Sequence, residues 1–149
     1  MRRRDFLLGL VTFAAMLPLK VLAALWNKAA FESVQITEAA RGLNINAEIL
    51  SSKILSTDIQ IIAPDRAENG AIVQVEVKSN IANTEAIAIF AEKNPTPLIA
   101  NFMFSNGAEP FVVTRIKMAE TSDIKVVVKA GNQYFSNAKN VEVLENGCG

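Results

Sequence analysis

The feature that most constrains the fold is a succession of short apolar runs, separated by turn formers, between residues 59 and 144. In the clearest run, Val73, Val75 and Val77 alternate with polar neighbours, and a period of two is typical of a half-buried strand. Turn-forming sequences such as ENG, NPTP and SNG stand between the runs. Short strands at this spacing predict a mainly β fold, an immunoglobulin-like antiparallel β-sandwich, although the Cys…Trp…Cys core of antibody domains is absent. The expected strands cover residues 59–63, 71–78, 86–92, 98–104, 111–118, 124–130, 133–136 and 140–144.

A short helical segment is expected before the first strand. Residues 27–34 and 37–41 are rich in helix-forming residues. Thr37 is the expected N-cap of the second helix, and Gly42 is its expected C-terminal stop.

The first 23 residues have the composition of an export signal. Arg2, Arg3 and Arg4 precede an apolar stretch that ends in small residues, and the sequence RRDFL resembles a twin-arginine signal. Cleavage after Ala23 would leave a mature chain of one domain, residues 24–144, followed by a C-terminal arm, residues 145–149. The alternative is an uncleaved amphipathic anchor.

Removal of this leader changes the charge balance. The whole chain has 15 basic and 15 acidic residues, and the leader contains four of the basic residues but only one of the acidic ones. The mature chain therefore has 11 basic and 14 acidic residues, a net charge of −3. No basic cluster remains to bind phosphates, which argues against a nucleic-acid-binding protein.

Cys148 is the only cysteine and stands next to last in the chain. An exported protein enters an oxidising compartment, where cysteines usually pair, so one unpaired cysteine indicates a reactive or intermolecular thiol. The chain contains no histidine, which excludes a Cys–His nucleophile pair or a histidine metal site built from this chain alone. An inert surface cysteine is the plainer alternative.

The residues around Cys148 are expected to form a flexible arm. Gly147 and Gly149 leave the backbone free on both sides of the cysteine, and no apolar side chain follows Leu144. Five residues beyond Leu144 span at most ~17 Å at ~3.3–3.6 Å each. Because Glu142, Glu145 and the terminal carboxylate are all negative, they disfavour the thiolate, and we expect a partner protein to activate the sulfur.

The sequence resembles the SoxY family, the sulfur-carrier subunits of the periplasmic thiosulfate-oxidising Sox system. Its tail NGCG, residues 146–149, is similar to the Gly-Gly-Cys-Gly-Gly arm of that family. Three further segments are similar: APDRAENG at 63–70, EKNPTPL at 92–98 and TRIKMAETS at 114–122. Asn146 replaces the first glycine of the arm and the last glycine is missing, but Asn tolerates left-handed conformations, so we expect the arm to stay mobile.

This resemblance implies a function and a set of partners. Cys148 would be the point of covalent sulfur attachment, while Asn146, Gly147 and Gly149 would supply freedom of motion. The chain itself would be no enzyme and would bind no metal or cofactor. Its partners would be SoxZ in a heterodimer, the c-type cytochrome SoxXA, the manganese hydrolase SoxB and, in some systems, the sulfane dehydrogenase SoxCD. An apolar face that includes Phe102 and Phe104 is the expected SoxZ contact.

Two other classes of function remain open on the residues alone. The chain could be an immunoglobulin-like binding module whose cysteine only forms intermolecular disulfides. It could instead be a thiol redox enzyme, although it lacks a resolving cysteine and a histidine.

Overall fold

The computed structural model describes residues 27–52, 55–105 and 107–145. The expected leader, residues 1–23, and the arm residues Asn146, Gly147, Cys148 and Gly149 lie outside the described residues. Within the described part of the chain, no helix is long and apolar enough to cross a membrane.

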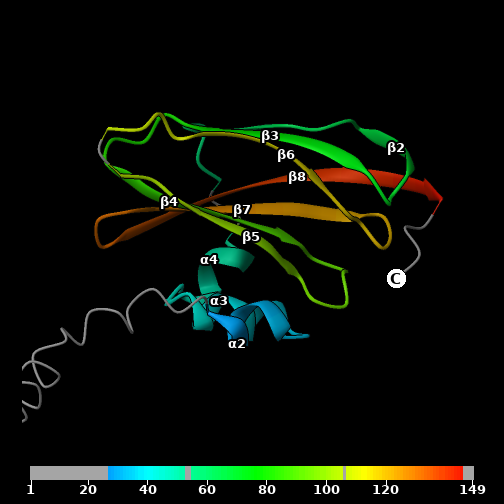
Figure 1. The fold of residues 1–149 in the computed structure, drawn as a ribbon, viewed down its shortest axis with the longest axis horizontal. Coiled ribbons are helices and arrows are strands. Elements are labelled where there is room, and N and C mark those ends of the chain that lie inside the picture. The colour runs from blue at the N-terminus through cyan, green and yellow to red at the C-terminus, as the bar shows by residue number, and fades with distance from the viewer. Residues whose placement is uncertain (1–26, 53–54, 106, 146–149) are drawn as a thin grey trace, which may run out of the picture.

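Two β-sheets face each other and form a sandwich (Figure 1). The smaller sheet has the order β1 (Ile59–Ile62), β3 (Val73–Ser79) and β6 (Phe111–Ile116). The larger sheet has the order β2, β8, β7, β4 and β5. Its strands are β2 (Arg66–Asn69), β8 (Gln133–Glu145), β7 (Ser122–Ala130), β4 (Thr84–Ala91) and β5 (Leu98–Met103).

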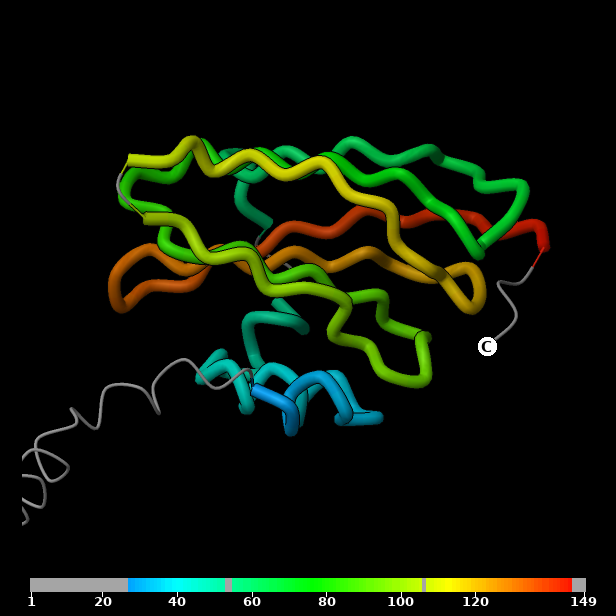
Figure 2. Tube along the Cα trace, viewed as in Figure 1, coloured from blue at the N-terminus to red at the C-terminus, as the bar shows by residue number. Residues whose placement is uncertain are grey.

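The mainly β sandwich predicted from the sequence is confirmed, with one difference in strand direction. All neighbouring strands run antiparallel except β2 and β8, which run parallel. The parallel pair joins residues 66–69 to residues 142–145, at the end of the molecule where the described chain terminates (Figure 2).

The main core lies between the two sheets. Val73, Val75 and Val77 of β3 point into it, as their alternation with polar residues predicts. Ile87 and Ile89 of β4 meet them from the larger sheet and are completely buried. This side-chain layer fixes the register of both sheets, because a slip of one residue would turn every apolar side chain of a strand outward.

Three short helices cover the outer face of the larger sheet (Figure 1). They are α2 (Lys28–Glu32), α3 (Ile36–Gly42) and α4 (Ala47–Ser51). Their buried Ala30, Ala39, Ala40 and Leu50 form a second core with residues such as Phe90 of β4. This cover explains why β4 is buried on both faces from Ala86 to Ala91.

Several local predictions need correction. Thr37 is not an N-cap: α3 begins at Ile36, and Gln35 precedes it without a side-chain cap. The expected strands 133–136 and 140–144 are a single strand, β8, which also includes Glu145, a residue that the sequence analysis assigned to the arm. β2 and α4 were not predicted.

Candidate functional site at the root of the C-terminal arm

The last described residues of the chain, at the end of β8, lie three residues before Cys148 and form the root of its arm. The antiparallel pairing of β8 with β7 ends where Ser122 faces Val141. Residues 142–145 extend beyond this point and are held by two other parts of the molecule.

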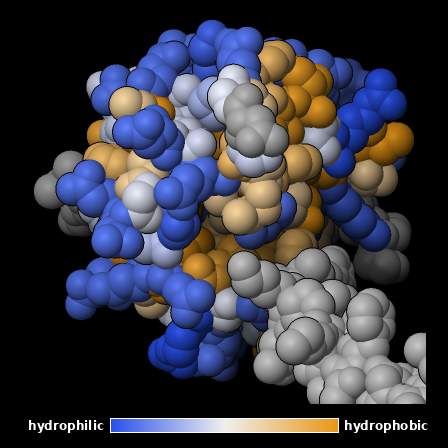
Figure 3. Space-filling view, turned by 60° about the vertical axis from the view of Figure 1, so that its left-hand side comes forward, coloured by the Kyte–Doolittle hydropathy of each residue, from blue (hydrophilic) through white to orange (hydrophobic). Residues whose placement is uncertain are grey.

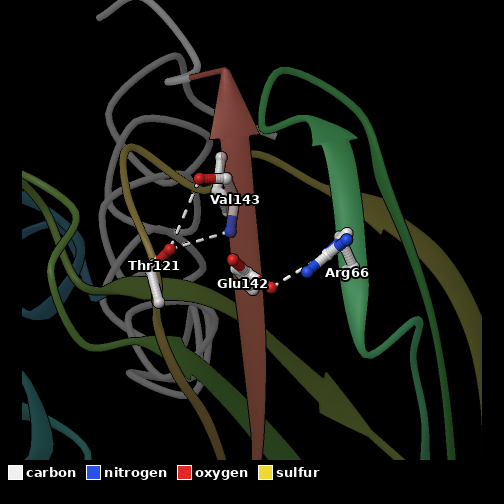
Figure 4. Close-up of polar contacts among 4 residues, drawn as sticks. All are labelled: Arg66, Thr121, Glu142 and Val143. Carbon is white, nitrogen blue, oxygen red and sulfur yellow. Dashed lines mark hydrogen bonds and ion pairs between the residues drawn. The ribbon is translucent and has the colours of Figure 1, made fainter.

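On one side, β2 is the sheet partner of this extension. Arg66, Ala67 and Asn69 pair with Glu142, Val143 and Glu145. The amide of Glu142 donates to the carbonyl of Asp65 at 2.9 Å, and the amide of Gly70 donates to the carbonyl of Glu145 at the same distance. The Arg66 guanidinium also contacts the Glu142 carboxylate at 2.9 Å (Figure 4).

On the other side, one side chain takes the place of a strand. Thr121 immediately precedes β7, and its hydroxyl accepts a hydrogen bond from the Val143 amide at 2.8 Å. The same hydroxyl donates to the Val143 carbonyl at 3.4 Å, a longer and weaker bond (Figure 4). The backbone of Val143 is thus bonded where β7 no longer reaches.

Packing also fixes the root. The side chains of Val143 and Ala67 are each only 7% exposed and belong to the core between the sheets. In contrast, Leu144 is half-exposed, at 52%. Main-chain hydrogen bonds therefore anchor the chain as far as Glu145, and side-chain burial anchors it as far as Val143.

The loop between β6 and β7 connects this root to the rest of the molecule. Asn94 of the β4–β5 loop donates to the carbonyl of Lys117 at 2.7 Å and accepts from the amide of Ala119 at 2.8 Å. The amide of Met118 donates to the carbonyl of Gly70 at 2.7 Å. Consequently the three segments singled out in the sequence, 63–70, 92–98 and 114–122, meet at the arm end of the molecule.

Charged residues near the root are mostly paired. Lys139 of β8 forms a hydrogen-bonded ion pair with Asp65, and this contact lowers the pKa of the Asp65 carboxyl. Glu142 faces Arg66, so its charge near the arm is partly compensated, a feature that the sequence did not reveal. Within the described residues, no group of three or more acidic or cysteine side chains is arranged to hold a metal ion.

The two phenylalanines expected at a partner contact share one environment, whereas other apolar side chains are exposed. Phe102 and Phe104 are partly buried and pack against the core between the sheets. Met103, between them, points outward and is 72% exposed. Phe111 and Val113 of β6 are also exposed. Figure 3 views the molecule with the end opposite the arm turned forward, and apolar patches lie there among hydrophilic residues.

Comparison with known proteins identifies the family. Residues 46–148 match the family profile described as sulfur oxidation protein SoxY. The chain is also similar to the sulfur carrier protein SoxY from Chlorobium limicola f thiosulfatophilum, with which it shares 40% sequence identity. The structural alignment has a TM-score of 0.56 and covers 60% of this chain and 82% of that chain. The two-sheet fold and the match to this profile thus define the class of protein, a β-sandwich protein that takes part in sulfur oxidation. Since the profile covers well over half of the sequence, the chain belongs to the SoxY family.

Other comparisons add little. Two structures of superoxide reductase (neelaredoxin) from Ignicoccus hospitalis are each 18% identical with a TM-score of 0.48. They align with 57% of this chain and with 78% and 79% of their own. A likeness this low bears on neither the fold nor the function. Among curated proteins, none matches the chain.

Proposed function

We propose that this chain is a periplasmic sulfur-carrier protein that holds thiosulfate-derived sulfur covalently on Cys148 and presents it to partner enzymes. The observation that carries this proposal is the extent of the family match, which runs through Cys148 itself. The 40% identical structure is that of a sulfur carrier, which supports the same role. The leader with its twin-arginine pattern supports export to the periplasm.

The chemistry needs a thiolate and an external oxidant. The Cys148 thiolate and the outer sulfur of thiosulfate would form an S–S bond, giving a cysteine S-thiosulfonate and releasing two electrons. A c-type cytochrome, SoxXA in the family, would accept these electrons. Water would then cleave the bond between the sulfane and sulfonate sulfurs, which releases sulfate and two protons and leaves a cysteine persulfide. The hydrolase SoxB would catalyse this step, and SoxCD, where present, would oxidise the remaining sulfur.

The architecture of the root suits a carrier. The last described residue, Glu145, is held in β8 and stands three positions before the cysteine. At ~3.3–3.6 Å per residue, the Cα of Cys148 can lie at most ~11 Å from that of Glu145. A thiol on so short a connection would be delivered to an active site by docking of the whole domain, with SoxZ as the heterodimer partner.

Mass spectrometry of the protein purified from thiosulfate-grown cells of its host tests this function. We expect adducts on the C-terminal peptide that a thiol reductant removes, with the masses of sulfur or thiosulfonate groups. Cys148→Ser should abolish loading but leave the fold and partner binding unchanged, because the substitution lies outside the core. A protein found only as a disulfide-linked dimer, and indifferent to thiosulfate, would instead favour the binding module.

A further inference from the structure

We infer that β2 and Thr121 together form a brace that sets the length of the carrier arm, with Thr121 as a positioning residue. This inference rests on the proposed function, since it concerns how far Cys148 can travel from the domain. The arm brace is defined as β2 (Arg66–Asn69) and the Thr121 hydroxyl.

β2 has a single role in the sheet. Among the described strands it pairs with β8 alone, and only with residues 142–145. Its sequence, RAEN, has one apolar side chain, Ala67, to contribute to the core. Because the other strands already form both sheets without it, the contribution of β2 is to hold the last four residues of β8.

The opposite side of β8 is held by the Thr121 hydroxyl. A strand end normally frays once its neighbour stops, because its backbone groups turn to water. Thr121 prevents this at Val143 by bonding both its amide and its carbonyl. The loop that carries Thr121 is in turn fixed by Asn94, which bonds Lys117 and Ala119.

The consequence is a fixed length of chain. With the brace closed, Cys148 is three Cα–Cα steps beyond the anchored Glu145, a span of at most ~11 Å. With the brace open, the last residue held by β7 is Val141, and Cys148 is seven steps beyond it, a span of at most ~25 Å. For a linker that already spans its two sites, effective concentration falls roughly as the −3/2 power of length, so for a closed arm that reaches the docked active site, opening should lower the delivery rate about three- to fourfold.

Variants at two exposed positions can remove bonds of the brace without replacing a core side chain. Thr121→Val removes the acceptor for the Val143 amide, and Glu142→Pro removes the amide that bonds the Asp65 carbonyl. Thr121→Ser keeps the hydroxyl and should behave as wild type. Thr96→Val is the matched control, since Thr96 is exposed and its hydroxyl has no hydrogen-bond partner among the described residues.

Arm length can be measured without any partner. A nitroxide attached to Cys148, the only cysteine, broadens the NMR signals of amides that it approaches. We expect the broadened amides to cluster around the end of β8 in the wild type, Thr121→Ser and Thr96→Val. In the double variant T121V/E142P they should extend along the sandwich, and exchange of the Val143 amide should accelerate at least tenfold. An unchanged set of broadened amides, despite faster Val143 exchange, would overturn the inference.

A glycine insertion separates arm length from other effects of the substitutions. Four glycines placed after Glu145 lengthen the connection from three residues to seven without touching the brace. Enzymatic loading of Cys148 with thiosulfate should slow about three- to fourfold in this variant and in T121V/E142P alike. When the insertion is added to T121V/E142P, the connection lengthens only from seven residues to eleven, so loading should slow by only about a further twofold. If the insertion instead slowed loading as much in T121V/E142P as in the wild type, the two changes would not act through the same arm length. If Cys148 takes up no sulfur at all, the proposed function fails, while the nitroxide measurement still decides on the brace.

Discussion

Asp65 and Lys139 show how a single ion pair connects the start of the arm brace to β8. Asp65 immediately precedes β2, and its carbonyl also accepts the hydrogen bond from the Glu142 amide. Its side chain is largely exposed, so the pair contributes little to global stability. Hydrogen bonding and the charge of Lys139 nevertheless hold the pKa of the Asp65 carboxyl below its usual value.

The lowered pKa predicts how Asp65→Asn depends on pH. A carboxyl whose pKa is lower in the folded state stabilises that state above its unfolded pKa, and this stabilisation is lost as pH falls through the folded pKa. Wild type should therefore be slightly more stable than D65N at neutral pH, and the difference should vanish in acid. Urea unfolding at a series of pH values checks this. A difference that stays constant into acid would show that another interaction of Asp65 is responsible.

Single residues also mark what the sequence could and could not reveal about the site. Cys148 stands out because it is the only cysteine and follows the last strand. Thr121 has no such signal, since its role depends on a contact with Val143, 22 residues further along the chain. The sequence therefore singles out the proposed attachment atom but not the residues that anchor β8 before it.

At the scale of elements, the contact between α2 and α3 depends on a glycine, because it leaves no room for a Cβ at Gly42. A Cβ added to Gly42 would lie 2.7 Å from the Cβ of Ala30 and 3.1 Å from its Cα. Asn27, the N-cap of α2, also donates from its side-chain amide to the carbonyl of Gly42. Gly42, expected only as a helix stop, is thus also a packing residue.

Gly42→Ala should therefore destabilise the helical layer. Overpacking of this kind costs about 1–3 kcal/mol in the free energy of unfolding, which chemical denaturation can measure. The double variant G42A/A30G removes the atom that clashes, and it should recover part of this loss, less the cost of placing a glycine inside α2. If G42A alone is neutral, the two helices must be able to move apart without loss of packing.

The elements predicted from the sequence are those whose own residues specify them. β3, with its alternating valines, and β4, with its continuous apolar run, are clear because burial shapes their composition. β2 was missed because RAEN reads as part of a turn and becomes a strand only by pairing with residues 142–145. β8 was divided in two because its centre, from Asn137 to Asn140, is polar.

At the scale of the whole molecule, the helical layer lies partly outside the family match. The SoxY profile begins at residue 46, after α2 and α3. Together with Leu50 of α4, these two helices form one apolar cluster with Ala88, Phe90, Leu98 and Val127 on the outer face of the larger sheet. β4 therefore contributes side chains both to the core between the sheets and to the core under the helices.

Removal of the cover gives a prediction for the complete fold. A chain that begins at Asn46 should leave Phe90, which is 0% exposed in the structure, open to water on that face. We expect a loss of unfolding free energy on the order of a few kcal/mol, together with self-association through the uncovered face. A chain that begins at Asn27 keeps all three helices and is the matched control. Denaturation and size-exclusion chromatography compare the two, and equal stability would show that the cover is dispensable.

The place of β8 in the larger sheet, between β2 and β7, has a consequence for how the protein is made. The ribosome releases this strand after every other described strand, so the larger sheet is complete only once β8 has emerged and paired with β2 and β7. A translation product that stops within β8 would lack both a closed sheet and the cysteine. Under the proposed export of folded chains, an exporter that accepts only folded proteins would therefore reject products that stop within β8.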